Sequence, residues 1–216
     1  MNDFSTRRIM MVDTQVRPSD VTKFPIIAAM LLVLREDFVP DARREAAYAG
    51  VNIPLGDRRV VLEARSLAKM LDSLDVQPGE LVMDLAAGLG YGSAVLAALG
   101  ANVVAVEEAG LAPLARIRLD AGGCDGVKVV TAPLALGAPA DGPYDAIIVQ
   151  GAVEVMPEAI LAQIKEGGRI GAIFMEGALG IARIGLKKDG AVSWRYAFNA
   201  TAPVLPGFEA RRIFVL

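Results

Sequence analysis

One stretch of the sequence constrains the fold more than any other, a short apolar run over 81–85 that leads into a glycine-rich turn. Gly88, Gly90 and Gly92 follow at every second position, and an Ala/Leu-rich run begins at Ser93. This succession is typical of a strand, a tight turn and a helix. Glycine lets a ligand approach the main chain, and the start of the helix offers unpaired N–H groups. The stretch therefore predicts a cofactor-binding turn of the nucleotide type.

Two carboxylates accompany this turn. Asp84 lies in the first apolar run, and the next apolar run, over 102–106, ends in Glu107 and Glu108. Glu107 comes 23 positions after Asp84, which is about where a carboxylate binds the hydroxyls of a ribose in nucleotide-binding folds. We therefore expect Glu107 to contact a ribose and Asp84 to order the amides of the turn.

Composition excludes several kinds of site. The 22 basic and 25 acidic residues give a formal net charge of −3, without the broad positive footprint typical of nucleic-acid binders. A single cysteine, Cys124, rules out an internal disulfide framework, and the lack of histidine rules out every mechanism or metal site that needs an imidazole. We expect no nucleic-acid partner and no metal ion.

Two apolar stretches raise the question of a membrane span. The run over 24–34 has 11 residues and contains Pro25, well short of the roughly 20 residues that a spanning helix needs. The stretch over 81–106 is interrupted by Asp84 and the glycines. The first residues also lack the apolar core and cleavage site of a secretory signal. These patterns predict no membrane association and a cytoplasmic location, and they leave the oligomeric state open.

The pattern of elements changes at the Gln77-Pro78-Gly79 turn. Residues 1–78 are predicted to form a helical cap, with a loop over 51–56 and a helix over 63–74. Strands are then expected near 81–86, 102–107, 127–131, 144–150 and 169–175, helices near 91–99, 109–120 and 157–165, and a hairpin over 181–198 that turns at Asp189-Gly190.

Alternating strands and helices indicate a mostly parallel sheet. We therefore predict an α/β class I methyltransferase (Rossmann-like) fold. It has a seven-stranded, mostly parallel sheet, an antiparallel C-terminal hairpin and a helical N-terminal cap. The cap (1–78) and the methyltransferase core (79–216) are expected to form one compact unit.

Three blocks of sequence then carry a resemblance. They are Met11-Val12 with Gln15-Val16-Arg17, Ala29-Met30 and Arg35 to Pro40; Val82 to Tyr91; and Tyr144 to Val149 with Pro157 and Gly167-Gly168-Arg169. In these blocks the chain resembles the protein-L-isoaspartate O-methyltransferase family, as a divergent member.

The resemblance implies S-adenosyl-L-methionine as cofactor and O-methylation of a carboxylate, as in the repair of isoaspartate. The partner it implies is a protein or peptide substrate that bears a carboxylate, either a damaged aspartyl residue or some other carboxylate. The residues that it implies for cofactor binding are Asp84, Ala86, Ala87, Gly88, Gly90, Tyr91, Glu107, Pro133, Leu134 and Gln150.

Two departures from the family pattern concern the chemistry. The family carries a Thr-Ile-Ser-x-Pro loop whose hydroxyl lies by the transferred methyl group, and here Leu62 takes the place of the serine, with Ser66 displaced into the helix. Where the family has Gly-Asp-Gly near the adenine, this chain has Ala132-Pro133-Leu134. No catalytic residue is therefore assigned from the sequence.

Methyl transfer to a carboxylate does not require a strong base, because an aspartyl-type carboxyl has a pKa of about 4 and is already ionised at neutral pH. The enzyme mainly orients the reactants, which can lower the barrier by about 7 to 11 kcal/mol. Arg58 and Arg59 lie in the altered loop and are expected to pair with the substrate carboxylate. Val60 and Leu62 are expected beside them.

Two other functions compete with this interpretation. A non-catalytic or re-purposed S-adenosylmethionine-binding module of the same fold would explain the same two departures, at Leu62 and Pro133. Turnover of an isoaspartyl peptide would distinguish it from the enzyme. A nicotinamide dehydrogenase is disfavoured, because Gly88-Leu89-Gly90-Tyr91-Gly92 lacks the Gly-x-Gly-x-x-Gly spacing.

Overall fold

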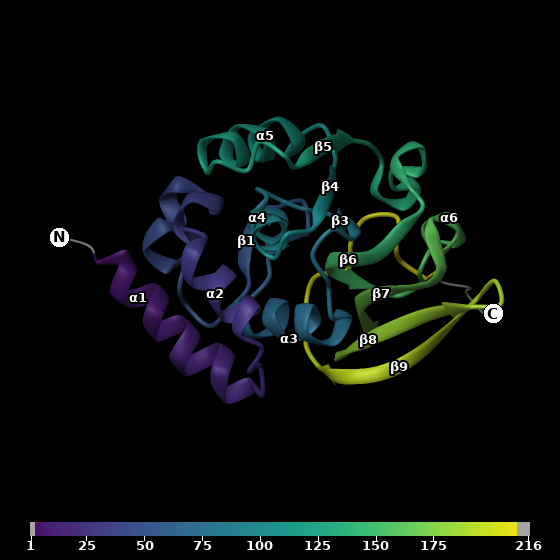
Figure 1. Cartoon of the computed structure of the whole chain (residues 1–216), viewed down its shortest axis with the longest axis horizontal. Coiled ribbons are helices and arrows are strands. Elements are labelled where there is room, and N and C mark those ends of the chain that lie inside the picture. The colour runs from purple at the N-terminus through teal and green to yellow at the C-terminus, as the bar shows by residue number, and fades with distance from the viewer. Residues whose placement is uncertain (1–2, 211–216) are drawn as a thin grey trace, which may run out of the picture.

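A seven-stranded sheet forms the centre of the computed structural model, which describes residues 3–210 (Figure 1). The strand order is β5-β4-β3-β6-β7-β8-β9, with the first five strands parallel and β8 antiparallel to both of its neighbours. The strands are β3 (Leu81–Leu85), β4 (Asn102–Glu107), β5 (Lys128–Thr131), β6 (Tyr144–Val153), β7 (Ile164–Glu176), β8 (Leu179–Lys188) and β9 (Ala191–Asn199). The predicted fold class is confirmed.

Both faces of the sheet are buried, because successive side chains of a strand point to opposite sides. Val82 and Ile148 pack in one apolar cluster with the N-terminal helices, whereas Met83 and Ile147 pack in a second cluster with Phe208. The helices are α1 (Phe4–Met11), α2 (Phe24–Leu32), α3 (Ala64–Leu74), α4 (Tyr91–Ala98), α5 (Ala112–Ala121) and α6 (Glu158–Leu161). Within residues 3–210, no helix is long and apolar enough to cross a membrane.

A buried arginine joins the N-terminal segment to the rest of the fold. Arg35 is fully buried, and its Nε and Nη2 atoms donate to the carbonyl oxygens of Ala47 and Leu62, each at 2.7 Å. The guanidinium also lies over the ring of Tyr91, at 4.6 Å from its centroid. Arg35 thus connects the N-terminal helices, the segment after β2 and the first residue of α4.

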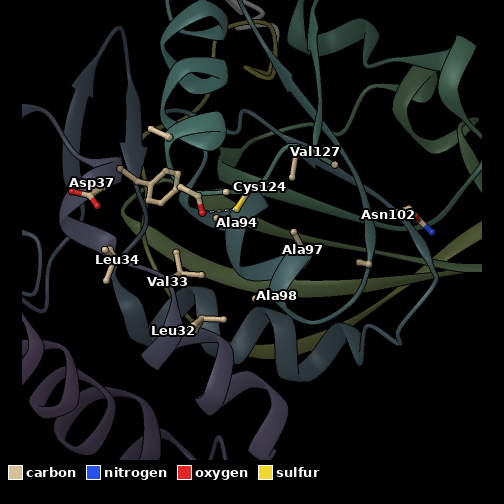
Figure 2. A pocket seen from close by; sticks show the side chains of 16 residues that line it. Leu32, Val33, Leu34, Asp37, Ala94, Ala97, Ala98, Asn102, Cys124 and Val127 are labelled. Atoms are coloured by element: carbon tan, nitrogen blue, oxygen red, sulfur yellow. Dashed lines mark hydrogen bonds between the residues drawn. The ribbon is translucent and has the colours of Figure 1, made fainter.

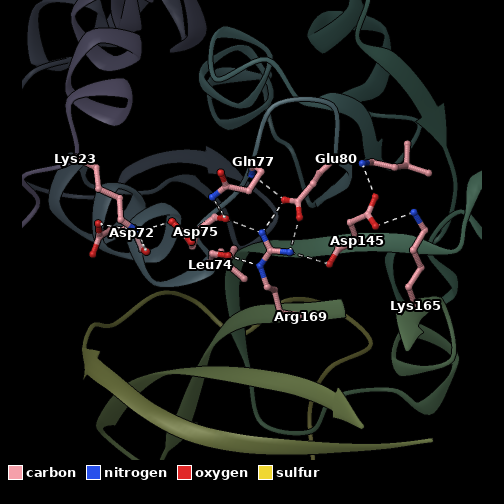
Figure 3. A network of polar contacts seen from close by, with 10 residues as sticks. Lys23, Asp72, Leu74, Asp75, Gln77, Glu80, Asp145, Lys165 and Arg169 are labelled. Carbon is pink, nitrogen blue, oxygen red and sulfur yellow. Dashed lines mark hydrogen bonds and ion pairs between the residues drawn. The ribbon is translucent and has the colours of Figure 1, made fainter. Parts of the chain in front are cut away.

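Opposite the carboxyl ends of the strands, a polar network surrounds Arg169 (Figure 3). Its Nη1 and Nη2 atoms bind the two carboxylate oxygens of Glu80 at 2.8 and 2.6 Å, and Nη2 also donates to the carbonyl of Asp75 at 2.7 Å. Lys23, from the N-terminal segment, pairs with the Asp75 carboxylate at 2.6 Å. Forked arginine–carboxylate pairs fix geometry well, so the network holds the α3–β3 connection against β7.

Two predicted elements are wrong. Residues 51–56 are not a loop, because β1 (Ile53–Gly56) and β2 (Arg59–Val61) form a separate antiparallel hairpin. The helix predicted over 157–165 ends at Leu161. The backbone carbonyl of Gln163 instead accepts from the Tyr144 N–H at 2.8 Å, and strand β7 begins at the next residue, where it pairs with β6.

Candidate functional site

The glycine-rich turn has the backbone that its sequence predicts. Gly88 and Gly90 adopt positive φ angles of 61° and 97°, a region in which glycine is unstrained. Ala86, which the sequence does not mark in this way, also has a positive φ, of 62°. The N–H groups of Ala86 and Ala87 both donate to the carbonyl of Val106, at 3.0 and 3.2 Å. The turn between β3 and α4 is therefore held against the carboxyl end of β4.

Asp84 lies beneath this turn and is fully buried. Its Oδ1 accepts from Gln150 Nε2 at 2.9 Å, and its Oδ2 accepts from Ser93 Oγ at 2.5 Å. Burial raises the pKa of Asp84 to about 6, and the hydrogen bonds from Ser93 and Gln150 partly oppose that shift. Sequence reasoning did not identify Ser93; its position in the first turn of the helix was the available signal.

Asp84→Asn should change how stability depends on pH. A carboxyl whose pKa is about 4 in the unfolded chain and about 6 in the folded one binds more protons when folded between those pH values, so its contribution to stability falls as pH rises through that window. The loss is about 3 kcal/mol. We expect the stability of D84N relative to wild type, from urea denaturation followed by the fluorescence of Trp194, to rise by about 2 kcal/mol from pH 4 to pH 7, since part of the loss already occurs below pH 4. A pH-independent difference would contradict the assignment.

Glu107 closes the site at the end of β4 and is also fully buried. Its Oε2 accepts from the backbone N–H of Gly88 at 2.8 Å, and its Oε1 accepts from that of Glu108 at 2.8 Å. The carboxylate therefore contacts the glycine-rich turn directly, at the place expected for a ribose-binding acid. We call residues 84–91 together with Glu107 the candidate cofactor site.

The β1–β2 hairpin lies on this site. Arg59 is only 2% exposed, and its Nε donates to Glu107 Oε1 at 3.1 Å while its Nη2 donates to Glu108 Oε2 at 2.6 Å. Its Nη1 is buried and has no hydrogen-bond partner within residues 3–210. Leu55 Cδ1 lies 2.7 Å from where a Cβ on Gly88 would be. Side chains of the chain itself therefore cover the turn.

The other residues expected at the acceptor loop lie apart from one another. Arg58 points outward, is about half exposed and pairs with Glu209 at 2.7 Å. Val60 and Leu62 are buried in the apolar core beside the N-terminal helices. Of the residues expected to face the substrate, only Arg59 reaches a carboxylate of the candidate cofactor site.

The residues expected near the adenine lie beside the end of β4. Ala132 donates its N–H to the carbonyl of Glu107 at 3.1 Å, and Pro133 and Leu134 follow it, the first exposed and the second buried. Tyr91 is buried under Arg35, and its hydroxyl has no hydrogen-bond partner among the described residues.

The donor set fits a ribose-containing cofactor. It supplies a tight turn in which Gly88 and Gly90 have positive φ angles, and a buried carboxylate at the end of the neighbouring strand. In residues 3–210, no group of three or more Cys, Asp or Glu side chains is placed to hold a metal ion.

A pocket of about 640 Å³ lies elsewhere, between the end of α2, α4 and the loop after α5 (Figure 2). Leu32, Ala94 and Ala98 line it, and the Cys124 side chain faces it. Burial raises the pKa of the Cys124 thiol, which favours the thiol over the more nucleophilic thiolate.

Comparison with known proteins gives a consistent result. The family model described as protein-L-isoaspartate(D-aspartate) O-methyltransferase matches residues 9–197. A protein-L-isoaspartate O-methyltransferase of Methylorubrum extorquens (strain PA1) is 37% identical over 169 residues, covering 78% of this chain and 74% of the relative. The enzyme of the same name from Koribacter versatilis (strain Ellin345) is 33% identical over 171 residues, covering 79% of this chain and 77% of the relative.

Two solved structures share the fold. One, described as a protein-L-isoaspartate O-methyltransferase, superposes with a TM-score of 0.79 at 22% identity and covers 94% of this chain and 66% of its own. The other is a putative enzyme of that name from Plasmodium falciparum, solved in complex with S-adenosyl-L-homocysteine. It superposes with a TM-score of 0.78 at 16% identity and covers 95% of this chain and 99% of its own.

Proposed function

Because this chain belongs to the protein-L-isoaspartate(D-aspartate) O-methyltransferase family, we propose that the candidate cofactor site binds S-adenosyl-L-methionine and that the β1–β2 hairpin faces the acceptor. The family consists of S-adenosylmethionine-dependent protein carboxyl methyltransferases. The observation that carries the proposal is the buried Glu107 carboxylate, held by the Gly88 amide at 2.8 Å at the carboxyl edge of the sheet. Ligands of doubly wound sheets bind at this edge.

The residues of the site have distinct tasks in this proposal. Glu107 accepts hydrogen bonds from the ribose hydroxyls, and Asp84, held by Ser93 and Gln150, fixes the turn beside it. The cofactor supplies an electrophilic methyl group. Asp84 and Glu107 are both fully buried, and burial strengthens the charge interactions that they make.

The chain does not need to remove a proton from the acceptor. A carboxylate with a pKa of about 4 is already an anion at neutral pH, so orientation is the main requirement. The family's loop hydroxyl is replaced by Leu62, whose side chain is buried and whose carbonyl is held by Arg35. In this proposal, Arg59 of the hairpin positions the acceptor instead.

The acceptor that fits best is an isoaspartyl residue in a damaged protein or peptide. Its carboxylate complements the guanidinium of Arg59, and the two curated relatives named above carry the isoaspartate activity in their names. The net charge of −3 argues against a nucleic-acid partner. A cytoplasmic location is consistent with the single cysteine, which is free, because cytosolic proteins rarely contain disulfides.

The test compares two peptides that differ only in having an isoaspartyl or a normal aspartyl residue. With methyl-labelled S-adenosylmethionine, we expect a base-labile methyl ester on the isoaspartyl peptide and none on its control. Titration with S-adenosyl-L-homocysteine tests the cofactor separately. Binding of S-adenosyl-L-homocysteine without ester formation would support the non-catalytic module. If S-adenosyl-L-homocysteine does not bind, the cofactor assignment is refuted.

A further inference from the structure

Arg59 occupies a position that the proposed cofactor also requires. Three N–H groups converge on the Glu107 carboxylate: the backbone amides of Gly88 and Glu108, and Arg59 Nε. The first amide belongs to the glycine-rich turn and the second to the residue that follows β4, so both are fixed by the fold. Among the described residues, Arg59 supplies the only side-chain donor to Glu107 and is thus the displaceable one.

The Glu107 carboxylate has too few hydrogen-bond acceptor sites to bind Arg59 Nε and a ribose diol at the same time. An ionised carboxylate offers about four lone-pair sites, and the three donors leave about one of them free. A ribose diol that donates both of its hydroxyls needs two. Glu107 therefore cannot hold Arg59 Nε and both hydroxyls together, whereas it can hold the two amides and both hydroxyls.

We propose that Arg59 changes partners, from Glu107 to the acceptor's carboxylate, when the cofactor's ribose is bound at Glu107; this inference rests on the proposed function. The side chain is 98% removed from solvent and its Nη1 already lacks a partner. Once Nε leaves Glu107, the half-exposed Glu108 on Nη2 is its one remaining carboxylate among the described residues, and a buried guanidinium with two unpaired nitrogens favours a second anion. The guanidinium fork suits a carboxylate. Arg59 thereby makes acceptor binding depend on bound cofactor.

The hairpin that carries Arg59 is separate from the main sheet. Its two strands, of four and three residues, form a sheet of their own, and Ile53, Val60 and Val61 anchor it in the apolar core. At its turn, the Arg58–Glu209 ion pair is about half exposed on both sides, and pairs of this kind contribute little to stability. A local rearrangement of the hairpin therefore leaves the main sheet intact.

The first measurement is calorimetric titration of S-adenosyl-L-homocysteine into wild type, R59Q and R43Q. Arg43 is exposed and lies outside the hairpin, in a helical turn after α2, so R43Q is a matched control for the loss of one positive charge. We expect R59Q to bind at least tenfold more tightly than wild type, because the competitor for Glu107 is gone. R43Q should bind like wild type.

The second measurement is the fluorescence anisotropy of a labelled isoaspartyl peptide. Wild type should bind the peptide only when S-adenosyl-L-homocysteine is present, and R59Q should lose most of that binding. Tighter cofactor binding with weaker peptide binding is a pair of opposite effects that a purely structural role of Arg59 does not produce. R59K, which keeps the charge but not the fork, should bind the peptide at an intermediate level and serves if R59Q misfolds.

The outcomes separate the two proposals. Equal or weaker binding of S-adenosyl-L-homocysteine by a folded R59Q, or peptide binding by R59Q like that of wild type, overturns the partner change and leaves the proposed function standing. If neither wild type nor R59Q binds the cofactor product, the proposed function itself is refuted, and the partner change with it.

Discussion

Glu107→Gln should lower the affinity for S-adenosyl-L-homocysteine at least a hundredfold. Hydrogen bonds to a charged group contribute about 1.5 to 3 kcal/mol each, so two ribose hydroxyls on Glu107 exceed the roughly 2.8 kcal/mol that a hundredfold change requires. The amide of glutamine also offers one accepting oxygen to three converging donors. Calorimetric titration measures the affinity directly.

The same substitution should cost stability, because it leaves the buried Arg59 cation with only the half-exposed Glu108 as partner. Removing one member of a buried ion pair costs about 3 to 5 kcal/mol, and we expect the lower end. Near-ultraviolet circular dichroism establishes that the variant is folded at the titration temperature. Glu108→Gln is the matched control and should retain the cofactor affinity. A folded E107Q with wild-type affinity would show that Glu107 does not hold the ribose.

Gly92→Ala should have the largest effect on stability of any single methyl group added near the site. A Cβ at Gly92 would lie 2.1 Å from Gln150 Nε2 and 3.1 Å from Asp84 Oδ2, both on buried side chains. Overpacking of this kind costs about 1 to 3 kcal/mol, and losing the Gln150 hydrogen bond to Asp84 adds about 1.5 to 3 kcal/mol. We expect a loss of about 3 to 5 kcal/mol in urea denaturation.

Gly110→Ala provides the control for this prediction, because a Cβ there meets no atom within 4 Å. It should change the free energy of unfolding by less than about 0.5 kcal/mol, as surface substitutions usually do. If both alanine variants are equally stable, the Asp84–Gln150 contact does not constrain the start of α4.

The sequence predicted the sheet well because the pattern that specifies it is local. The apolar runs at 81–85 and 102–106 are buried on both sides and are flanked by turn residues, which distinguishes them from helices. The hairpin of β8 and β9 followed from Asp189-Gly190, both of which adopt positive φ angles. Glu107 could be placed for the same reason, because it ends a strand.

The β1–β2 hairpin could not be predicted in this way. It turns at Asp57 and Arg58, with φ angles of 45° and 58°, where turn rules favour asparagine or glycine. It also contains Pro54, which weakens a strand prediction. Its stability comes from contacts with distant residues, such as Arg59 with Glu107, 48 positions away.

The roles of Arg58 and Arg59 could not be predicted either, because they depend on the β1–β2 hairpin. As neighbours in a loop, Arg58 and Arg59 were expected to act together. In the structure Arg58 lies in the turn and pairs with Glu209, whereas Arg59 is the first residue of β2 and pairs with Glu107. Burial of Arg35 and its bond to the Leu62 carbonyl likewise have no local signal. Such contacts are tertiary and leave no periodic trace in the sequence.

The central claim is that Glu107 pairs with Arg59 when no cofactor is bound and with the ribose hydroxyls when the cofactor is bound. A crystal structure of the protein grown with S-adenosyl-L-homocysteine tests it most directly. We predict that both ribose hydroxyls lie within hydrogen-bond distance of the Glu107 carboxylate, that the Gly88 and Glu108 amides keep their bonds to it, and that Arg59 Nε has left it. A bound ligand with the Arg59–Glu107 pair still at its present 3.1 Å would contradict the claim.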